Sequence, residues 1–448
     1  MIILKKIFSI ILVAVIFVSC FCINGNAAFN SLLETEADIV LLINMDSDTV
    51  IFDKNADKRS APASLTKIVT CMLVLENCDD LSVPLTCERM HLDDLYRQNA
   101  ATAGIRTGET LTIEQLLYCL MIPSAADAAN ILACHVGGSF DGFVTMMNDF
   151  VKELGCENTN FINPHGLDGD GGAYTTANDL YIITKYALTN PTFKKITSTT
   201  RYDVAPTNEY SQTRYLHNTN KMMNPAYKDY YSPTIQGVKT GTSDLAGRCV
   251  ISTASKNGYN YMLIVMNAPQ YDIDNDGVEE NVAFTDSKKI YEWAFKYIEL
   301  TKITNTTDVV TVVDVEYNWK IDHLRLLPAQ ELSALVPTGT QAGSLEIRPI
   351  ESETPKVVKA PIEKGEILGK AEVLYGEDVV ATVDLVAGES VSRSIILWII
   401  GIIKTILSTT IVKILLAFVV VLIIIYIFLI IRRNKIRAKR RKIKMVKG

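Results

Sequence analysis

A serine and a lysine at helical spacing are the first residues in this chain that point to chemistry. Ser64 stands three positions before Lys67, and the run from Leu65 to Leu75 holds good helix formers and no breaker. This pattern predicts that Ser64 lies at or just inside a helix N-terminus, with Lys67 on the same face. A serine hydroxyl becomes a strong nucleophile when a base takes its proton, and a lysine is such a base once burial or a second cation keeps it neutral. The free N–H groups of the helix start also suit a developing oxyanion.

The same tetrad equally fits an N-cap serine beside a solvated lysine, so a site needs support from other stretches. Ser124 stands at the junction between a predicted helix over 112–121 and an alanine-rich helical start. Farther along, Lys239 opens the polar run Lys239-Thr240-Gly241-Thr242 just before predicted strands. A catalytic interpretation requires a fold that brings these three stretches together.

The elements around these stretches predict an α+β domain in which helices pack on an antiparallel sheet. A hairpin comes first, helices occupy the middle, and strands with a closing helix come last, which is the pattern of that class. The predicted elements are a hairpin over 38–44 and 49–52, the helix from Ser64, helices over 112–121 and 176–188, a loop over 163–172, strands over 249–254 and 259–267, and a helix over 291–298.

Both ends of the chain are typical of an exported and anchored protein. Residues 1–27 have a charged start, an apolar centre and a small-residue cleavage site, as a secretory signal peptide does. Lipid attachment at Cys20 is the alternative, although the leucine usual before such a cysteine is missing. Residues 414–431 carry no charge and are long enough to form a transmembrane helix, which places the basic tail 432–448 in the cytoplasm.

Two further segments connect the first domain, residues 28–300, to the membrane. Short β-rich runs alternate with turns over 301–393, which predicts a small all-β domain that holds the first domain away from the bilayer. Residues 394–413 are apolar but contain Lys404, which predicts an interfacial or membrane-proximal helix. A longer, tilted span is the alternative for this segment.

Charge and cysteine content narrow the class of protein. Outside the signal and the tail, 32 Lys and Arg stand against 50 Asp and Glu, and this acidic exterior argues against a nucleic-acid partner. Cys71, Cys119 and Cys134 fall in apolar helical runs, where a small buried thiol is expected. Cys78 and Cys87 flank a short loop and could form a disulfide, but no staple framework is present.

No metal or cofactor is predicted. The segment Asp272–Gly277 begins like a calcium loop, yet position twelve is Ala283 instead of the required glutamate, so a polar hairpin tip is the better interpretation. His165 lies in no serine-hydrolase elbow, and an imidazole that fixes a loop is its ordinary role. The chain has no His-Glu-x-x-His zinc motif and no phosphate loop.

Taken together, the motifs resemble a known family. The order Ser64-x-x-Lys67, Ser124-Ala125-Ala126, Lys239-Thr240-Gly241 resembles the three signatures of penicillin-binding proteins and serine β-lactamases. The runs Pro62–Lys67, Asn163–Leu167 and Gly237–Gly241 look like the D-alanyl-D-alanine carboxypeptidases of low molecular mass within that group. The resemblance covers roughly residues 35–297, the run Ala360–Gly365 looks like the domain that follows in that family, and a C-terminal membrane anchor is also typical of it.

The resemblance implies an enzyme that removes the terminal D-alanine from peptidoglycan stem peptides ending in D-Ala-D-Ala, with β-lactams as covalent inhibitors. Ser64 would attack the carbonyl between the two D-alanines, Lys67 would take its proton, and water would release the acyl-enzyme. Ser124 would relay a proton to the leaving amine. No cofactor is implied.

The resemblance also assigns the substrate contacts. Lys239 would help to keep Lys67 neutral, and Thr240 would bind the terminal carboxylate of the substrate. The backbone N–H groups of Ser64 and Thr242 would form the oxyanion hole, with Gly241 leaving room on an edge strand for the substrate backbone. Arg248 is a candidate second carboxylate contact, and a surface salt bridge is its alternative.

One position departs from the family pattern. Family members usually have Ser-x-Asn at the second signature, and here the third residue is Ala126. In the family that amide is thought to position the substrate backbone and to bind the active-site lysine, which a methyl group cannot do. The loss of one such hydrogen bond weakens binding by about 0.5–1.5 kcal/mol, so we expect slower turnover. Asn130, one turn later, is a conceivable substitute.

Other functions remain as alternatives. A DD-endopeptidase uses the same residues, and a β-lactam hydrolase needs a deacylating glutamate for which the sequence offers no placed candidate. A non-catalytic protein that binds the wall or senses β-lactams would explain Ala126 as decay of the site, but Ser64, Lys67 and Lys239 are intact.

Overall fold

The computed structural model describes residues 33–446 apart from 97, 99, 169–171 and 273–278. The predicted signal peptide and most of the acidic loop after Asp272 therefore lie outside the described residues. The chain forms two compact units. The first unit takes the residues up to Lys302 with 333–346 and 373–381, and the second takes 303–332, 347–372 and the residues from Thr382 onward.

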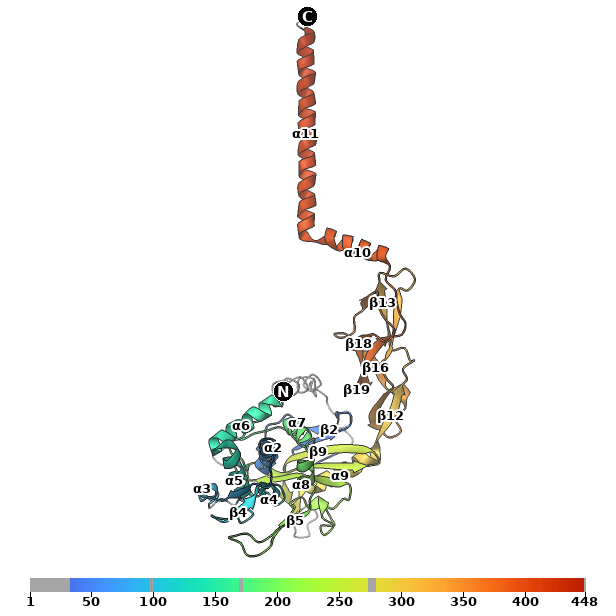
Figure 1. The fold of residues 1–448 in the computed structure, drawn as a ribbon. Helices are drawn as coiled ribbons and strands as arrows, with labels where there is room; N and C mark the ends of the chain where they lie inside the picture. Colours follow the sequence, from blue (N-terminus) through green and yellow to red (C-terminus); the bar gives the residue numbers. More distant parts are fainter. Residues whose placement is uncertain (1–32, 97, 99, 169–171, 273–278, 447–448) are drawn as a thin grey trace. The chain divides into compact units, whose positions relative to one another are not determined.

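An antiparallel sheet forms the centre of the first unit (Figure 1). In the described residues it has five strands in the order β2-β1-β9-β8-β7, so β7 lies at an edge. The predicted antiparallel pairing is confirmed along the sheet. The strands are β1 (Ile39–Asn44), β2 (Thr49–Lys54), β7 (Ile235–Ser243), β8 (Gly247–Lys256) and β9 (Tyr259–Ala268).

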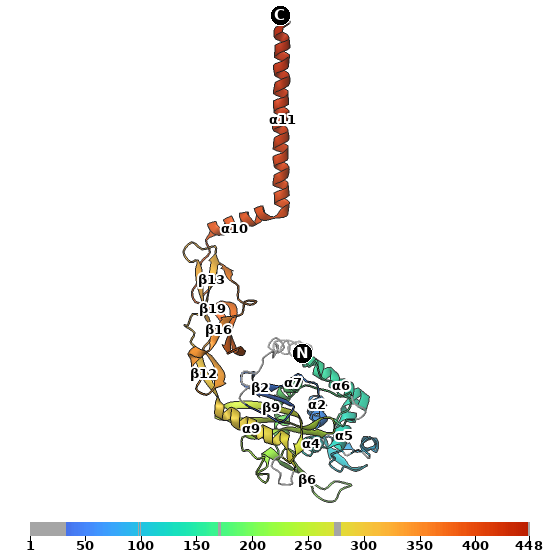
Figure 2. The same ribbon diagram turned by 180° about the vertical axis from the view of Figure 1, so that it is seen from behind.

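Helices cover both faces of this sheet. The interior strand β1 is therefore buried along its whole length. Ile39, Leu41 and Ile43 belong to the main core together with apolar side chains of α2, α4, α5 and α7. From the opposite face, Tyr291 of α9 donates a hydrogen bond of 2.8 Å to the Ser252 carbonyl, and Figure 2 shows α9 along this face. The helices are η2 (Ala63–Thr66), α2 (Lys67–Asn77), α4 (Ile113–Met121), α5 (Ala126–Gly137), α6 (Phe140–Glu153), α7 (Ala177–Ala187), α8 (Pro191–Thr197) and α9 (Val282–Tyr297).

The sequence predicted the start of α4 correctly and the start of α9 incorrectly. The capping box at the start of α4 is present, since Thr112 Oγ1 accepts from the Gln115 N–H and Gln115 Oε1 accepts from the Thr112 N–H. The predicted start of the closing helix at 291 is wrong, because α9 begins at Val282. Its first residues, Val282, Ala283 and Phe284, are apolar and buried, and Asp286 in the next turn accepts the Ala37 N–H at 2.8 Å.

Short elements border the first unit. The short helix α3 (Met90–Asp93) lies between α2 and α4 in the chain. Short antiparallel strand pairs form outside the central sheet. These pairs are β3 (Pro84–Thr86) with β4 (Thr110–Thr112), β5 (Arg201–Val204) with β6 (Arg214–His217), and β10 (Gln270–Tyr271) with β11 (Glu280–Asn281). The predicted hairpin at 272–277 thus has its flanks paired, while its tip lies outside the described residues.

The region after the first domain is all-β, as predicted. In the part that the structure describes, a sheet of six strands has the order β16-β18-β19-β14-β13-β17, and β12 pairs separately with β15. The strands are β12 (Ile298–Thr304), β13 (Thr311–Glu316), β14 (His323–Pro328), β15 (Leu332–Pro337), β16 (Glu346–Pro349), β17 (Val357–Lys359), β18 (Ile367–Tyr375) and β19 (Asp378–Ala387).

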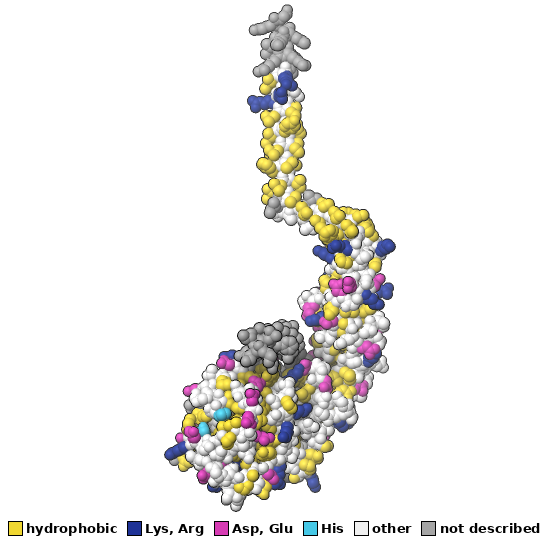
Figure 3. Space-filling view, in the orientation of Figure 1, with side chains coloured by type: hydrophobic (Ala, Val, Ile, Leu, Met, Phe, Trp, Pro, Cys, Tyr) yellow, Lys and Arg dark blue, Asp and Glu magenta, His cyan; other side chains and the backbone are white. Residues whose placement is uncertain are grey.

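Two helices end the chain, α10 (Ile395–Ser408) and α11 (Thr410–Val446). Thr409 between them is extended, with ψ 139°, so α10 does not continue into α11, which already includes the last residues of the predicted segment 394–413. Within the described residues one helix, over Val412–Arg437, is long and apolar enough to cross a membrane. Figure 3 shows its hydrophobic side chains giving way to Lys and Arg at the far end.

The cysteines in the described residues are free thiols, so the possible disulfide between Cys78 and Cys87 is not formed. Cys87 is buried with its thiol toward the Glu88 carbonyl, whereas Cys78 ends α2 and is partly exposed. Cys71 and Cys119 are buried as expected, and Cys134 is only half-buried.

Candidate active site

Ser64 and Lys67 lie side by side, as their spacing predicted. Ser64 is in η2, directly before α2, and Lys67 is the first residue of α2. Lys67 Nζ lies 2.9 Å from Ser64 Oγ. The lysine is 2% exposed, whereas Ser64 is half-buried and open to a ligand. A nucleophile and a base thus face each other at hydrogen-bond distance.

Burial makes Lys67 suitable as a base. Because the charged ammonium is poorly solvated inside the protein, the pKa of Lys67 falls to about 7, although nearby Asp127 opposes this shift. Lys239 is equally buried, and its pKa lies well below its usual value because of burial and then of the charge on Lys67. Burial is therefore the main cause of the lowered pKa of Lys67. The expected repulsion between the two lysines contributes to the lowered pKa of Lys239.

The loop 163–167 packs on η2 and on the start of α2. Lys67 Nζ donates to the His165 carbonyl at 2.6 Å, and Thr70 Oγ1 donates to the Pro164 carbonyl at 2.6 Å. Gly166 has φ +82°, and a Cβ there would lie 1.9 Å from the Ala63 carbonyl oxygen. The sequence predicted a loop here but not its contact with Lys67, since a backbone carbonyl leaves no mark on residue type.

The His165 side chain fixes this loop, as predicted. Its Nδ1 accepts the Leu167 N–H at 3.2 Å, and its Nε2 lies 3.0 Å from Asp94 Oδ2. The Asn163 amide closes the loop internally, with Oδ1 accepting the Gly166 N–H at 2.6 Å. These contacts leave His165 Nε2 and Nδ1 both occupied, away from Ser64.

Ser124 lies in the turn between α4 and α5, with φ +67°. It is 5% exposed, and its hydroxyl oxygen has no hydrogen-bond partner among the described residues. Ala126 opens α5 and is 1% exposed, and its N–H donates to the Ala101 carbonyl. Asn130 does not take over a contact with Lys67, because its Nδ2 donates to the His91 carbonyl and to Asp94.

The edge strand β7 carries the third group of predicted residues. Thr240 Oγ1 lies 2.6 Å from Thr219 Oγ1, and the Thr219 N–H donates to the Ile122 carbonyl, so Thr219 joins the turn of Ser124 to β7. Sequence reasoning missed Thr219, which lies in an irregular polar stretch. Lys239 Nζ donates to the Thr240 carbonyl at 2.8 Å, and Thr242 is exposed beside it.

Gly241 lies where β7 comes close to η2. A Cβ at this position would lie 3.3 Å from Ala63 Cβ and 3.4 Å from Leu65 Cγ. The glycine therefore lets β7 approach η2 closely, and the predicted approach of a substrate backbone at this position stays a prediction. The consequence is that β7 and the nucleophile segment pack as one piece.

Arg248 stands opposite Thr242 in the β7–β8 register. It is half-exposed, and within the described ranges its guanidinium has no hydrogen bond or ion pair with another residue. The alternative of a surface salt bridge thus has no support from the described part of the chain.

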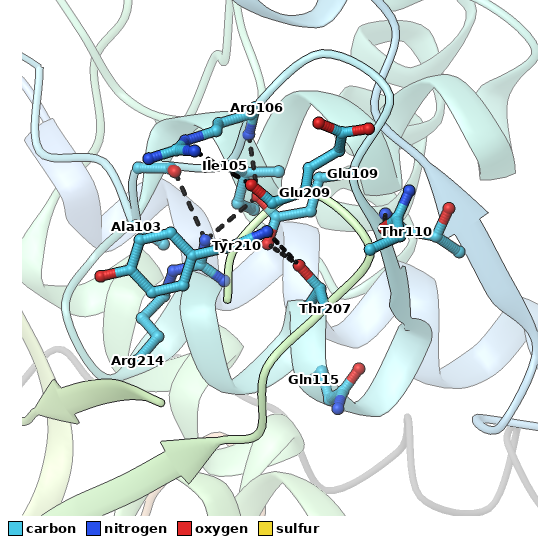
Figure 4. A network of polar contacts seen from close by, with 12 residues as sticks. Ala103, Ile105, Arg106, Glu109, Thr110, Gln115, Thr207, Glu209, Tyr210 and Arg214 are labelled. Carbon is cyan, nitrogen blue, oxygen red and sulfur yellow. Dashed lines mark hydrogen bonds and ion pairs between the residues drawn. The ribbon is translucent and has the colours of Figure 1, made fainter. Parts of the chain in front are cut away.

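A polar network around Glu109 joins the segment 103–110 to the segment 207–214 (Figure 4). Asp127 accepts the Ala103 and Ile105 N–H groups, each at 3.0 Å. Farther along the same segment, Glu109 is fully buried and accepts from Arg214 Nη2 at 2.8 Å. Residues 101–109 are thereby bonded to both α5 and β6.

Comparisons with known proteins agree with this geometry. The family profile described as D-alanyl-D-alanine carboxypeptidase matches residues 26–270, and the profile of the penicillin-binding protein 5 C-terminal domain matches 299–393. The carboxypeptidase DacF of Bacillus subtilis is 28% identical over 362 residues, which are 81% of this chain and 87% of DacF. An Escherichia coli D-alanyl-D-alanine endopeptidase is 29% identical over 239 residues, which are 52% of this chain and 72% of its own.

The fold is similar to that of solved structures of penicillin-binding proteins. The crystal structure of penicillin-binding protein 5 from Haemophilus influenzae superposes with a TM-score of 0.60 at 23% identity, over 81% of this chain and 99% of that one. This match supports the two-domain architecture. Because the carboxypeptidase profile spans more than half of the chain, and its residues include Ser64 paired with a buried Lys67, this protein belongs to the serine-type D-alanyl-D-alanine carboxypeptidase family of low-molecular-mass penicillin-binding proteins.

Proposed function

We propose that this protein is a membrane-anchored carboxypeptidase that removes the terminal D-alanine from peptidoglycan pentapeptide stems through an acyl-enzyme on Ser64. The observation that carries the proposal is the buried Lys67 amine, 2.9 Å from Ser64 Oγ, with a pKa lowered to about 7. A large part of such an amine is neutral at neutral pH and can accept the serine proton.

The contacts of Lys67 support a defined acylation step. The structure has Lys67 Nζ donating to both the His165 carbonyl and Ser64 Oγ. A neutral amine has two hydrogens and one lone pair, so at the same 2.9 Å it can instead accept the Ser64 hydroxyl proton while it still donates to the His165 carbonyl. Ser64 Oγ attacks the carbonyl carbon between the two D-alanines while Lys67 takes the proton. The N–H groups of Ser64 and Thr242 stabilise the oxyanion. When the C–N bond breaks, the proton returns through Ser124 to the leaving D-alanine amine.

Deacylation completes the cycle. Water adds to the ester on Ser64, the ester bond breaks, and the shortened peptide leaves with a new carboxyl group while Ser64 regains its proton. The buried Ser124 hydroxyl, which lacks a partner in the described part of the chain, is available for the proton relay in the acylation step.

The substrate terminus lies along β7 in this proposal. An extended peptide adds as a further strand to the open edge, which is a common mode of peptide recognition. Its terminal carboxylate meets Thr240, Arg248 and Lys239. An anion beside Lys239 favours the ammonium form, so substrate binding opposes the depressed pKa of this lysine.

The proposal includes the topology. A signal peptide over 1–27 exports the chain, 28–300 form the catalytic domain, 301–393 the all-β stalk, and 414–431 the membrane span with the basic tail 432–448 in the cytoplasm. The break at Thr409 supports α10 as a separate interfacial helix over a longer, tilted span.

The deciding experiment measures D-alanine release by the detergent-solubilised full-length protein from a peptide ending in two D-alanines. We expect release that Ser64→Ala abolishes, and labelling of Ser64 by a fluorescent penicillin. Cleavage of crosslinked stems without release of terminal D-alanine would instead indicate an endopeptidase. Labelling without either activity would favour a β-lactam sensor, the candidate that Ala126 supports.

A further inference from the structure

The Lys67 amine depends on a distant part of the chain for its position. Besides Ser64 Oγ, its acceptor is the His165 carbonyl at 2.6 Å, on a loop far away in sequence. Ala126, at the start of α5, has only a methyl group and offers the amine no polar contact. Whatever holds the loop of His165 therefore also determines where the base lies.

The imidazole of His165 anchors this loop to Asp94. The side chain is 4% exposed. Since Nδ1 accepts the Leu167 N–H, the proton of a neutral imidazole is on Nε2, which donates to Asp94 Oδ2 at 3.0 Å. His165 is thus held at both nitrogens, and its own carbonyl is held with it.

Asp94 is itself held by Asn130 of α5. The second carboxylate oxygen, Oδ1, accepts from Asn130 Nδ2 at 2.7 Å, and the same amide donates to the His91 carbonyl at 2.9 Å. Asn130 is fully buried. The opposite amide orientation would set its oxygen against a carbonyl and a carboxylate, so the contacts allow one orientation. Asn130 therefore fastens both the backbone of α3 and the side chain that follows it.

We propose that Asp94 and Asn130 are positioning residues for catalysis, holding the Lys67 amine against Ser64 through the loop of His165. Through these contacts they fix the position of the Lys67 amine, which the methyl group of Ala126 cannot hold by a hydrogen bond. The inference rests on the proposed function, because it takes Lys67 as the base.

The first test compares acylation by a labelled penicillin in full-length wild type, Asp94→Asn and Asp93→Asn. The two donors reach different oxygens of Asp94, and an asparagine places an NH2 group at one of these two positions, so it cannot accept from both His165 and Asn130 in this geometry. We expect Asp94→Asn to slow acylation about tenfold. Asp93 is the matched control: it ends α3, its side chain is 64% exposed, and among the described residues its carboxylate pairs with exposed Arg89 at 3.5 Å. Its variant should stay within about twofold of wild type.

The second test asks whether Asp94 acts through the lysine. Ala126→Asn places an amide at the start of α5, where the family has one. We expect this change alone to speed turnover, and in its background Asp94→Asn should slow acylation less than about threefold. A residue that only stabilises the fold would cause the same loss in both backgrounds.

The third readout does not depend on activity. In protein labelled with ¹³Cε-lysine, the Lys67 resonance is identified by its loss in Lys67→Met. Asp94→Asn and Asn130→Ala should shift or broaden it, and Asp93→Asn should not. An unchanged Lys67 signal in both variants would overturn the inference, as would equal acylation of the Asp93 and Asp94 variants. Failure of wild type to be acylated would count against the proposed function, while the lysine spectrum would still decide this inference.

Discussion

Burial turns one ordinary lysine into a base. Lys67 is the first residue of α2 and lies inside the core, so its charge must be given up at a pH where an exposed lysine keeps it. The hydrogen bonds to Ser64 and to the His165 carbonyl then decide which way the amine points. Reactivity and placement thus come from different parts of the chain.

The acylation rate should follow the titration of Lys67. Its pKa is lowered to about 7, and the neutral form is the active one, so the rate should be low at pH 5.5 and rise through about pH 7 to a plateau. Stopped-flow acylation by a fluorescent penicillin measures this profile, with unfolding curves at each pH as a check that the fold is intact. A flat profile would rule out Lys67 as the titrating base.

The burial of Lys67 also lowers the free energy of unfolding at neutral pH. The folded-state pKa is below the unfolded value of 10.5, so between about pH 7 and 10.5 the unfolded chain binds a proton that the folded chain does not. Stability from this group therefore rises with pH across that window. We expect Lys67→Met to raise the free energy of unfolding at pH 7 on the order of 2 kcal/mol, with the gain shrinking toward pH 10.5. Urea unfolding at the two pH values measures it.

The contact between the 163–167 loop and η2 requires glycine at 166. Gly166→Ala places a methyl group 1.9 Å from the Ala63 carbonyl oxygen and also strains a backbone with φ +82°. Gly155→Ala is the matched control, because φ is +87° but nothing lies within 4 Å of the new methyl. We expect a loss of about 1–2 kcal/mol for the control and clearly more for Gly166→Ala. Chemical unfolding of both variants tests this, and equal losses would mean that the loop can move away.

The network around Glu109 should be a sensitive point of the first unit. Glu109→Ala leaves the Arg214 charge buried without its carboxylate, so we expect a loss of about 3–5 kcal/mol. Asp203→Ala is the control. It breaks an exposed ion pair with Arg201 within β5, the strand beside the one that carries Arg214, and should change the free energy of unfolding by less than about 1 kcal/mol. Denaturant midpoints compare the two variants. A small effect of Glu109→Ala would indicate that water reaches Arg214.

Local patterns predicted the elements better than they predicted the contacts between them. Ser64 and Lys67 were found because their partnership lies within one helical turn, and the sheet followed from alternating strands. Thr219, Asp94 and the His165 carbonyl were not found, because each acts through contacts between segments distant in sequence. The start of α9 was also missed, because the polar residues Asp286 and Ser287, which are buried in the structure, interrupt the apolar pattern in the sequence.

At the scale of the whole molecule, the first compact unit contains segments of the chain from beyond residue 300. That unit includes 333–346, and β12 pairs with β15, whose Val336 is fully buried. A fragment that ends at residue 300 lacks β15, so we expect a Tm about 5–10 °C below that of a fragment ending at 393. Differential scanning fluorimetry of the two fragments measures this. Equal Tm values would show that the β12–β15 pair adds nothing to the first unit.

The unpaired thiols have a consequence for how this protein can be studied. Burial raises the pKa of Cys249 to about 12 and moves that of Cys71 well above its usual value, so neither is a reactive thiolate in the folded protein. Cys249 packs beside Gly241 on the substrate strand, and Cys71 follows Lys67 by one turn of α2. Alkylation of either one must wait for its segment to open. The rates at which Cys249 and Cys71 react with an alkylating reagent therefore measure how often β8 and α2 open, without an engineered probe.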